Sequence, residues 1–177
     1  MSPGKRSPKN GLISASDERI FRLMFEGHSA VMLLLEPETG AILDANQAAV
    51  DLYGYPKSKL CGMSINDINT LSAEQVKGER QKALSKERNN FIFSHRLANG
   101  EVRIVEIYSS PIALQEKRVL FSIIHDITER RQVDEELRGS IESYRALFNN
   151  MMDGIYRSTH AGKFVDVNPA MVKMFGY

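Results

Sequence analysis

The side chains that most often carry out chemistry are few in this chain of 177 residues, and they form no recognised catalytic or metal-binding pattern. The four histidines, at positions 28, 95, 125 and 160, lack the spacing of zinc ligands. His125 and Asp126 could belong to a catalytic triad, but neighbours on a strand point to opposite faces of a sheet. The sequence also lacks a glycine-rich phosphate loop and the GxSxG, HExxH and kinase signatures. We therefore expect no catalysis within these residues, and we interpret His95 and His125 as structural or solvated.

The single cysteine, Cys61, lies in the sequence LCGM. One cysteine excludes an intramolecular disulfide and fits a reducing, cytoplasmic compartment, so we interpret Cys61 as a small buried hydrophobic side chain. The formal net charge of +1 gives no electrostatic reason to expect binding to nucleic acid or to an anionic membrane. The longest apolar run, residues 30–35, is far shorter than the roughly 20 residues of a membrane span.

Hydrophobic spacing predicts the elements that would position these residues. Helices are expected at residues 17–26, 47–53 and 72–86, and a run of turns and small helices at 57–69. Ser16 or Asp17 would cap the first helix, whereas Asn46 would cap the second and Gly54 would end it. Strands are expected at residues 31–35, 41–45, 90–98, 101–112 and 118–124, with a hairpin turn at 99–100 and a loop at 113–117.

This order of elements indicates an α+β fold in which five antiparallel strands carry helices packed on one side. In the last strand, residues 119–124 are almost continuously apolar, as expected when both faces of a strand are covered. We expect the N-terminal helix to cover the outer face. A linker helix should follow the last strand.

The chain contains an internal repeat. Shifting it by 122 to 123 residues aligns residues 21–55 with 144–177, including Gly40 with Gly162 and Asn46 with Asn168. A repeat of this length indicates tandem modules. The second copy is too short to bury a core of its own, so we expect the chain to be a fragment of a longer multidomain protein. The predicted division is a disordered lead-in at 1–16, a domain at 17–130, a linker helix at 131–143 and the start of a second domain at 144–177.

Five motifs carry a family resemblance: GAILDANQAA at 40–49, LYGY at 52–55, ANGEVR at 98–103, SPI at 110–112 and IHDITER at 124–130. With these motifs, residues 17–130 resemble a PAS domain, the PAS/PAC sensory module of signalling proteins. The second copy resembles the opening third of that family. The resemblance implies a sensor or dimerisation unit that holds a small molecule, haem, flavin or nothing between sheet and helices. Such a unit passes a conformational change to an output domain.

The implied ligand pocket lies between the helices and the sheet. Asn46 or Ser109 could supply polar contacts, and the expected lining contains no charged residue, so any ligand should be small and mostly apolar. The alternative is that the lining residues simply form the core. The expected lining from the helices is Val50, Tyr53, Leu60, Ile65, Ile68 and Val76, and from the sheet, by alternation, Leu33, Phe91, Phe93, Ile107 and Phe121.

The resemblance also bears on cofactors. Flavin-binding relatives form an adduct through a cysteine in an asparagine-cysteine-arginine-phenylalanine context, which Cys61 lacks. Haem-binding relatives place an axial histidine on the long helix, and residues 72–86 contain none. The sequence therefore argues against haem and covalently bound flavin and leaves the identity of any ligand open.

The stretch after the last strand is the expected signal relay, formed by Asp126, Thr128 and Glu129. Asp126 and Glu129 have the spacing of a capping box, which would tie the final strand to the linker helix. Positions 127, 130, 134, 137, 141, 144 and 148 alternate steps of three and four and are mostly apolar, which predicts a parallel homodimer through this helix. The pair Gly139-Ser140 instead favours a kinked, monomeric linker.

Three hypotheses of function remain open from the sequence. The first is a binding and signalling module. The second is part of a sensor histidine kinase or diguanylate cyclase whose catalytic domain lies beyond Tyr177. The third is a dimerisation segment that binds no ligand.

Overall fold

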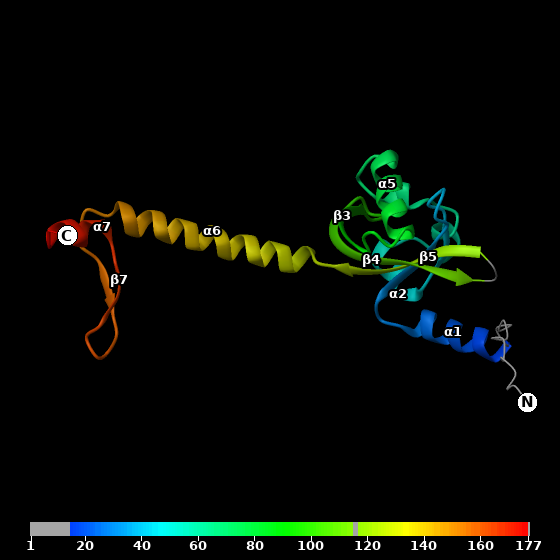
Figure 1. Ribbon diagram of the computed structural model, residues 1–177, viewed down its shortest axis with the longest axis horizontal. Coiled ribbons are helices and arrows are strands. Elements are labelled where there is room, and N and C mark those ends of the chain that lie inside the picture. The colour runs from blue at the N-terminus through cyan, green and yellow to red at the C-terminus, as the bar shows by residue number, and fades with distance from the viewer. Residues whose placement is uncertain (1–14, 115–116, 177) are drawn as a thin grey trace, which may run out of the picture. The chain divides into compact units, whose positions relative to one another are not determined.

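The computed structural model describes residues 15–114 and 117–176, with side chains from Arg19 onward (Figure 1). Contacts divide the chain into two units, Met1–Ile127 and Thr128–Tyr177. Most of the predicted lead-in, residues 1–14, and part of the predicted loop, residues 115–116, lie outside the described residues. In the part of the chain that the structure describes, no helix combines the length and apolar content needed to span a membrane.

The first unit is built on the predicted five-stranded antiparallel sheet, in the order β2-β1-β5-β4-β3. β4 and β5 are longer than predicted, because their pairing continues as far as Leu114 and Lys117. β3 is shorter than predicted, because the amide of Ala98 leaves the ladder and donates to the Tyr53 carbonyl at 2.9 Å. The strands are β1 (Val31–Leu35), β2 (Ile42–Ala45), β3 (Asn90–Arg96), β4 (Val102–Leu114) and β5 (Lys117–Asp126).

The hairpin of β1 and β2 leads directly into helix α2 (Gln47–Tyr53). Gly40 ends the hairpin turn with φ of +76°, a conformation that favours glycine. Asn46 caps α2 as predicted, since its Oδ1 accepts from the amide of Ala49 at 3.0 Å. Gly54 ends the helix in the left-handed conformation, with φ of +72°.

Three further helices follow: α3 (Lys57–Leu60), α4 (Ile65–Ile68) and α5 (Ala73–Leu84). α5 begins with a capping box, in which Ser72 accepts from the amide of Gln75 and the Gln75 side chain accepts from the amide of Ser72. Ser64 and Asp67 form the same arrangement at α4. These caps explain why short, polar segments are helical despite few apolar residues.

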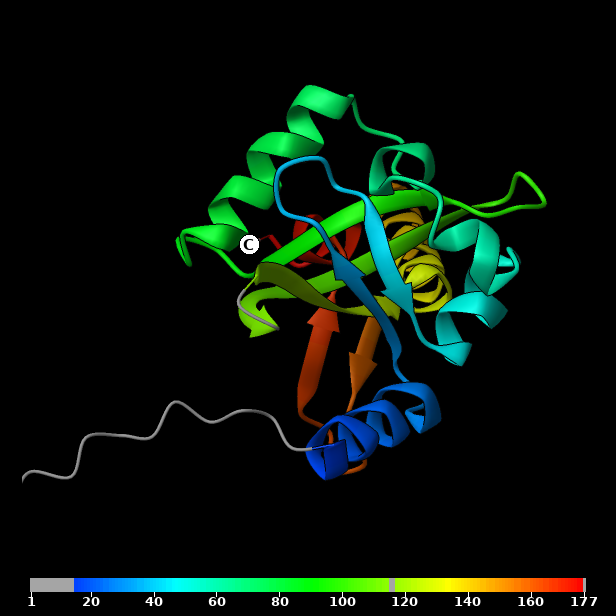
Figure 2. The same ribbon diagram turned by 90° about the vertical axis from the view of Figure 1, so that its right-hand side faces the viewer.

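Apolar side chains fill both sides of the sheet. The larger cluster lies between the sheet and helices α2 to α5. The smaller cluster lies under helix α1 (Ala15–Gly27), where Phe25 packs with Met32, Leu34 and Val119. Figure 2 shows α1 and α5 on opposite sides of the sheet. The expectation that α1 covers the outer face is confirmed, and it explains why β5 is apolar on both faces.

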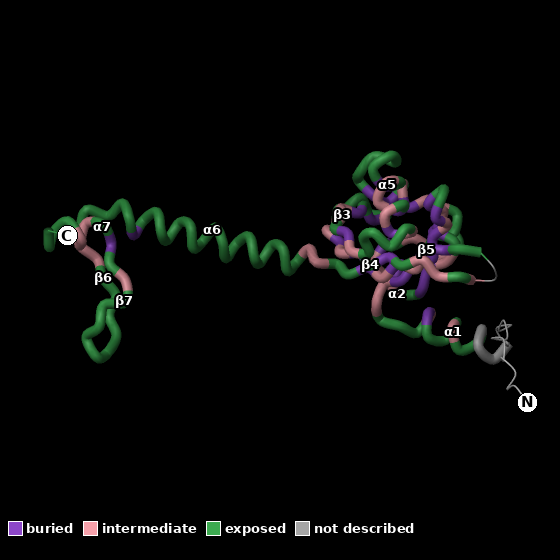
Figure 3. Tube along the Cα trace, in the orientation of Figure 1, coloured by how far each residue is buried: buried purple, intermediate pink, exposed green. Residues whose placement is uncertain are grey.

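The second unit contains α6 (Thr128–Asn150), β6 (Tyr156–Ser158), β7 (Phe164–Val167) and α7 (Pro169–Met174). α6 is one uninterrupted helix through Gly139 and Ser140, and most of its length is exposed (Figure 3). β6 and β7 form an antiparallel hairpin that leads into α7, capped by Asn168. This order repeats the order of β1, β2 and α2.

Candidate functional site

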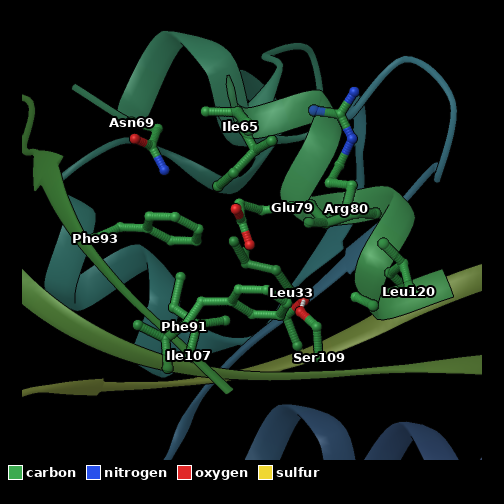
Figure 4. Close-up of a pocket in the computed structure, with 15 residues that line it drawn as sticks. Leu33, Ile65, Asn69, Glu79, Arg80, Phe91, Phe93, Ile107, Ser109 and Leu120 are labelled. Atoms are coloured by element: carbon green, nitrogen blue, oxygen red, sulfur yellow. Dashed lines mark hydrogen bonds between the residues drawn. The ribbon is translucent and has the colours of Figure 1, made fainter. Parts of the chain in front are cut away.

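A small cavity lies between the sheet and helix α5 (Figure 4). Its volume is about 30 Å³, enough for about two water molecules. Leu33, Leu35, Ile65, Asn69, Val76, Glu79, Arg80, Ala83, Phe91, Phe93, Ile107, Ser109, Leu120, Ser122 and Ile124 line it.

The alternation of side chains along the strands and the helical spacing on α5 together bring these residues around the cavity. On β5, alternate residues face the cavity, namely Leu120, Ser122 and Ile124. On α5, the lining residues Val76, Glu79, Arg80 and Ala83 follow the spacing of one helix face. The sheet therefore forms the floor of the cavity and α5 forms its roof.

The floor carries a pair of buried hydroxyls. Ser109 Oγ on β4 lies 2.5 Å from Ser122 Oγ on β5, so one hydroxyl donates its hydrogen to the other. Ser109 was expected to offer a polar contact, and it does line the cavity. This bond uses only one of the two O–H groups, so the pair can still offer a polar contact to a ligand.

Arg80 ties the roof to the β1–β2 turn. Its Nε donates to the Pro37 carbonyl at 3.1 Å, one terminal nitrogen to the Glu38 carbonyl at 3.0 Å, and the other to Asn66 Oδ1 at 3.3 Å. Burial lowers the pKa of Arg80, and the nearby carboxylates of Glu36 and Glu38 partly oppose this shift. The guanidinium is therefore committed to the turn, and the bonds hold α5 against the hairpin.

Glu79 corrects the expectation that the lining carries no charge. Its Oε1 accepts from Lys82 Nζ at 2.9 Å. Its Oε2 is fully enclosed and has no hydrogen-bond partner among the described residues. The sequence prediction failed because α5 is mostly polar, so its inward face had few apolar residues to mark it.

His95 lies in a buried polar network beside the cavity. The Tyr53 hydroxyl is 2.9 Å from His95 Nδ1, and the Asn69 amide nitrogen is 3.5 Å from Nε2. The ring also stacks on Phe93, with centroids 6.2 Å apart. Burial lowers the pKa of His95 to about 4 and raises the pKa of Tyr53, the latter helped by Asp126. The interpretation of His95 as structural agrees with this setting, and His125 is exposed.

Apart from Ser109 and Phe121, the predicted pocket residues divide into three groups. The first lines the cavity and comprises Leu33, Ile65, Val76, Phe91, Phe93 and Ile107. The second belongs to the surrounding core without lining the cavity and comprises Val50, Tyr53, Leu60 and Ile68. Asn46, the third, is fully buried and holds backbone groups of the hairpin instead.

Phe121 was assigned to the wrong face. It packs in the cluster under α1, with its ring centroid 6.5 Å from that of Phe25. Its neighbours Leu120 and Ser122 face the cavity. A strand that is apolar on both faces gives no marker for the phase of its alternation, so the prediction was off by one residue.

Sequence reasoning also missed other residues that line the cavity, namely Leu35, Asn69, Glu79, Arg80, Ala83, Leu120, Ser122 and Ile124. The signal that could have found the α5 residues is helical spacing from Val76, which was correctly assigned. Steps of three, four and seven from Val76 reach Glu79, Arg80 and Ala83.

The cavity offers no evident cofactor ligand. Its described lining contains neither histidine nor cysteine. Among the described residues, no three His, Cys, Asp or Glu side chains come together in a way that could hold a metal ion. Cys61 is exposed at the end of α3, which corrects its interpretation as a buried residue; partial desolvation and Asp44 raise the pKa of its thiol.

The expected relay residues lie where β5 gives way to α6. Asp126 ends β5, and its Oδ2 is 3.4 Å from a terminal nitrogen of Arg103 on β4. Thr128 begins α6, and Glu129 lies in its first turn. The capping box of Asp126 and Glu129 stays a prediction.

Comparison with known families decides the identity of this fold. The model of the PAS domain family matches residues 29–129. The chain belongs to the PAS domain family. A second PAS domain model matches residues 142–177, so the PAS signature occurs on both sides of the central part of α6. As a PAS domain, the chain is a sensory, signal-transducing module.

Curated relatives of this PAS chain are signalling proteins. It is 30% identical over 142 residues to diguanylate cyclase DgcM of Escherichia coli K12, and the matched region covers 76% of this chain and 33% of that protein. It is 26% identical over 166 residues to sporulation kinase E of Bacillus subtilis, covering 91% of this chain and 21% of the kinase. The chain thus spans a third or less of the length of these two relatives.

Solved structures agree with the fold. The PAS domain of an HTR-like protein from Haloarcula marismortui has a TM-score of 0.57 at 23% identity, over 63% of this chain and 93% of that one. An RNA-binding light-oxygen-voltage receptor has a TM-score of 0.60 at 17% identity, over 80% of this chain and 42% of that one. At these identities the likeness concerns the fold alone.

Proposed function

We propose that this PAS domain binds a small ligand in the cavity under α5 and relays a conformational signal through α6 to an output domain beyond this chain. The observation that carries the proposal is the path of β5. Leu120, Ser122 and Ile124 of this strand line the cavity, and the strand ends at Asp126, two residues before α6 begins. A ligand that shifts β5 therefore acts on the start of the helix.

The size of the cavity sets a condition on binding. At about 30 Å³ it is far below the roughly 300 Å³ of an ordinary ligand site. A ligand would have to separate α5 from the sheet. This coupling between occupancy and the position of α5 is what a sensor requires.

Purified protein tests the ligand directly. Mass spectrometry of the denatured chain should reveal a colourless small molecule, and the absorption spectrum should contain neither a Soret band nor flavin bands. Either spectrum would contradict the expectation that haem and covalent flavin are absent. Protein that carries no ligand and takes up none from an extract would favour the alternative of a dimerisation segment.

The second part of the proposal is a parallel homodimer through α6. Leu137, Ile141 and Tyr144 are 59%, 44% and 54% exposed, and they lie at the steps of four and three that a two-stranded coiled coil uses. Charged residues surround this stripe, which suits the solvated sides of a paired helix. The uninterrupted course of α6 through Gly139 supports a straight seam over a kinked linker.

Sedimentation equilibrium of the chain tests the dimer. We expect a concentration-dependent dimer that Ile141→Lys weakens by about tenfold or more, since a charge would enter the apolar seam. Glu135→Lys changes a charge on the same helix outside the seam and should leave dimerisation intact. A chain that stays monomeric at high concentration would exclude this relay.

The phase of α6 tests the relay itself once the chain is joined to an output domain. Seven residues inserted after Leu137 should preserve control, whereas four should rotate the downstream part by about 40° and lock or abolish the response. The relatives named above, a diguanylate cyclase and a kinase, favour an output domain of the cyclase or kinase class, and the C-terminal sequence of the full-length protein would distinguish the two. A cytoplasmic location fits the free Cys61 thiol.

A further inference from the structure

One wall of the cavity carries an acceptor that the protein leaves unused. Glu79 projects from α5 toward the middle of the cavity, between Phe93 and Leu33 (Figure 4). Its Oε2 is enclosed and has no hydrogen-bond partner among the described residues. A buried carboxylate oxygen without a donor is unfavourable, so a group that supplies a donor there would gain affinity.

The neighbouring cations do not supply that donor. Lys82 is bonded to the outer oxygen, Oε1, at 2.9 Å. Arg80 is next to Glu79 in sequence, but its guanidinium is bonded to the β1–β2 turn and to Asn66. The cavity therefore presents one acceptor oxygen without a donor among mostly apolar side chains, while the other charged lining residue, Arg80, is bonded elsewhere.

The rest of the lining selects further. Phe91 and Phe93 lie on the same strand and line the cavity with Glu79. Their rings stack on each other at 5.8 Å, Phe93 also stacks on His95, and the Arg88 guanidinium lies over Phe91, so the two rings contribute hydrophobic surface to the lining. Leu33 and Ile107 complete a hydrophobic surface for an apolar body. The Ser109 and Ser122 hydroxyls bond each other and are neutral, so they attract an ammonium group less strongly than the Glu79 carboxylate does.

A groove outside the cavity provides a route to it. This groove, between α5 and β3, has a volume of about 390 Å³ and is lined by Leu71, Gln75, Gly78, Glu79, Arg88, Phe91, Ile92 and Phe93. Glu79, Phe91 and Phe93 line both the groove and the cavity. The three side chains thus stand between the open groove and the enclosed space.

We propose that the cavity selects a small organic ammonium ion with an apolar body, which enters from the α5–β3 groove and donates its N–H groups to Glu79 Oε2. The inference rests on the proposed ligand-binding function and adds the chemical class of the ligand. Anionic ligands are disfavoured, because their charge would face the Glu79 carboxylate in a poorly solvated space.

Three probes of nearly equal size and shape test this selection: benzylamine, benzyl alcohol and benzoate. Methyl NMR spectra of the full chain should show saturable shifts for Leu33 and Ile107 with benzylamine, weaker binding of benzyl alcohol and no binding of benzoate. In Glu79→Gln the affinity for benzylamine should fall by about tenfold or more, and the affinity for benzyl alcohol should stay within about twofold.

Two control variants separate the cavity-facing oxygen from the ion pair outside. Lys82→Gln removes the partner of Oε1 and leaves Oε2 in place, so benzylamine should bind at least as tightly as to the wild type. Glu74→Gln removes an exposed carboxylate from the same helix and should have no effect. All three variants should fold, with melting temperatures within about 4 °C of the wild type.

The outcomes distinguish this inference from the proposed function. Benzyl alcohol that binds as tightly as benzylamine, or benzylamine binding that Glu79→Gln leaves unchanged, would overturn the ammonium preference and leave the ligand site standing. Benzoate binding that equals benzylamine binding would do the same. Failure of every probe to bind up to about 10 mM would overturn both the inference and binding in this cavity.

Discussion

The two copies of the β-hairpin and helix have nearly the same local structure and opposite burial. In the first copy Leu33 pairs with Ala45 and Leu35 with Ile42, and the register shifts at a bulge between Leu34 and Leu35. In the second copy Tyr156 pairs with Val167 and Ser158 with Phe164, and the bulge recurs at the same point. The glycines at the turns also match, with φ of +76° at Gly40 and +80° at Gly162.

The capping asparagines show how far the likeness extends. Asn46 Nδ2 donates to the Ala30 carbonyl at 2.8 Å, and its Oδ1 accepts from the amide of Met32 at 3.0 Å. Asn168 Nδ2 donates to the Asp153 carbonyl at 2.8 Å, and its Oδ1 accepts from the amide of Ile155 at 2.8 Å. Each asparagine thus joins the start of the helix to the start of the hairpin.

The difference lies in what covers the hairpin. Leu33 and Ile42 are 0% and 1% exposed, whereas the corresponding Tyr156 and Phe164 are 54% and 58% exposed. The first hairpin is covered because β1 pairs with β5 and because α4 and α5 close the far side. About 25 residues are therefore enough to specify the local geometry, but burial requires partners from distant sequence.

The largest expected effect comes from separating the two copies. Without residues 139–177, the chain should melt cooperatively, with a midpoint close to that of the full chain, because all strands of the sheet remain. Residues 144–177 alone should show no sharp transition, since their apolar side chains have no sheet to cover them. Circular dichroism during heating would measure both. A first unit that unfolds without residues 139–177 would refute the domain boundary.

The second prediction concerns the paired asparagines. Asn46→Ala should lower the free energy of unfolding by about 4 kcal/mol, because it removes a helix cap and leaves buried backbone groups without partners. Asn168→Ala removes the same bonds from the second copy and should leave the melting of the first unit unchanged. Equal effects of the two changes would mean that the copies fold as one cooperative unit.

The parts of the fold that were predicted correctly are those with local determinants. The capping bond of Asn46, the helix end at Gly54 and the hairpin turn depend on neighbours within a few residues, so the sequence marks them. The succession of elements along the chain, two strands, small helices and then three strands, was also predicted correctly, because the resemblance covers the whole domain. The ends of β4 and β5 were predicted incorrectly, because the length of a β-ladder depends on both of its strands.

The site was predicted less completely, because facing residues are set by packing and not by local pattern. The prediction for Phe121 was wrong because both faces of β5 are apolar there. Glu79 and Arg80 were not predicted to line the cavity, because charged residues on a polar helix normally face solvent. Only contacts with distant segments show that these two side chains face inward. The role of Arg80 depends on the β1–β2 turn, which lies more than forty residues earlier in the chain.

The third prediction uses His95, a buried titratable residue on β3 of the first unit. Burial lowers the pKa of His95 to about 4 from 6.5, so the folded state favours the neutral ring. The stabilisation is complete above about pH 6.5 and is lost as the pH falls toward 4, by up to about 3 kcal/mol. Tyr53 and Asn69, which face the ring, are polar but uncharged in this range and supply no compensating charge.

Urea unfolding between pH 4 and 7 would measure this loss. His95→Asn keeps a polar group near the Tyr53 hydroxyl and should flatten the pH dependence, although it lowers stability at neutral pH. His160→Asn changes an exposed histidine in the second copy and should leave the profile as it is. A wild-type profile that stays flat between pH 6.5 and 4 would show that His95 is accessible to protons without cost.

The smallest expected effect isolates what the first hairpin turn contacts. A Cβ at Gly40 would lie 2.5 Å from a terminal nitrogen of Arg80, whereas a Cβ at Gly162 would meet no atom within 4 Å. The second copy should show no melting transition of its own, so Gly100 in the first unit is a better control than Gly162. It has φ of +87° and open space around it, so Gly100→Ala reports backbone strain alone, about 1 kcal/mol. Gly40→Ala adds the displacement of Arg80 and should cost about 1–2 kcal/mol more in urea unfolding. If the two variants lose equal free energy of unfolding, Arg80 can leave the β1–β2 turn freely. Arg80 would then not hold α5 against the hairpin.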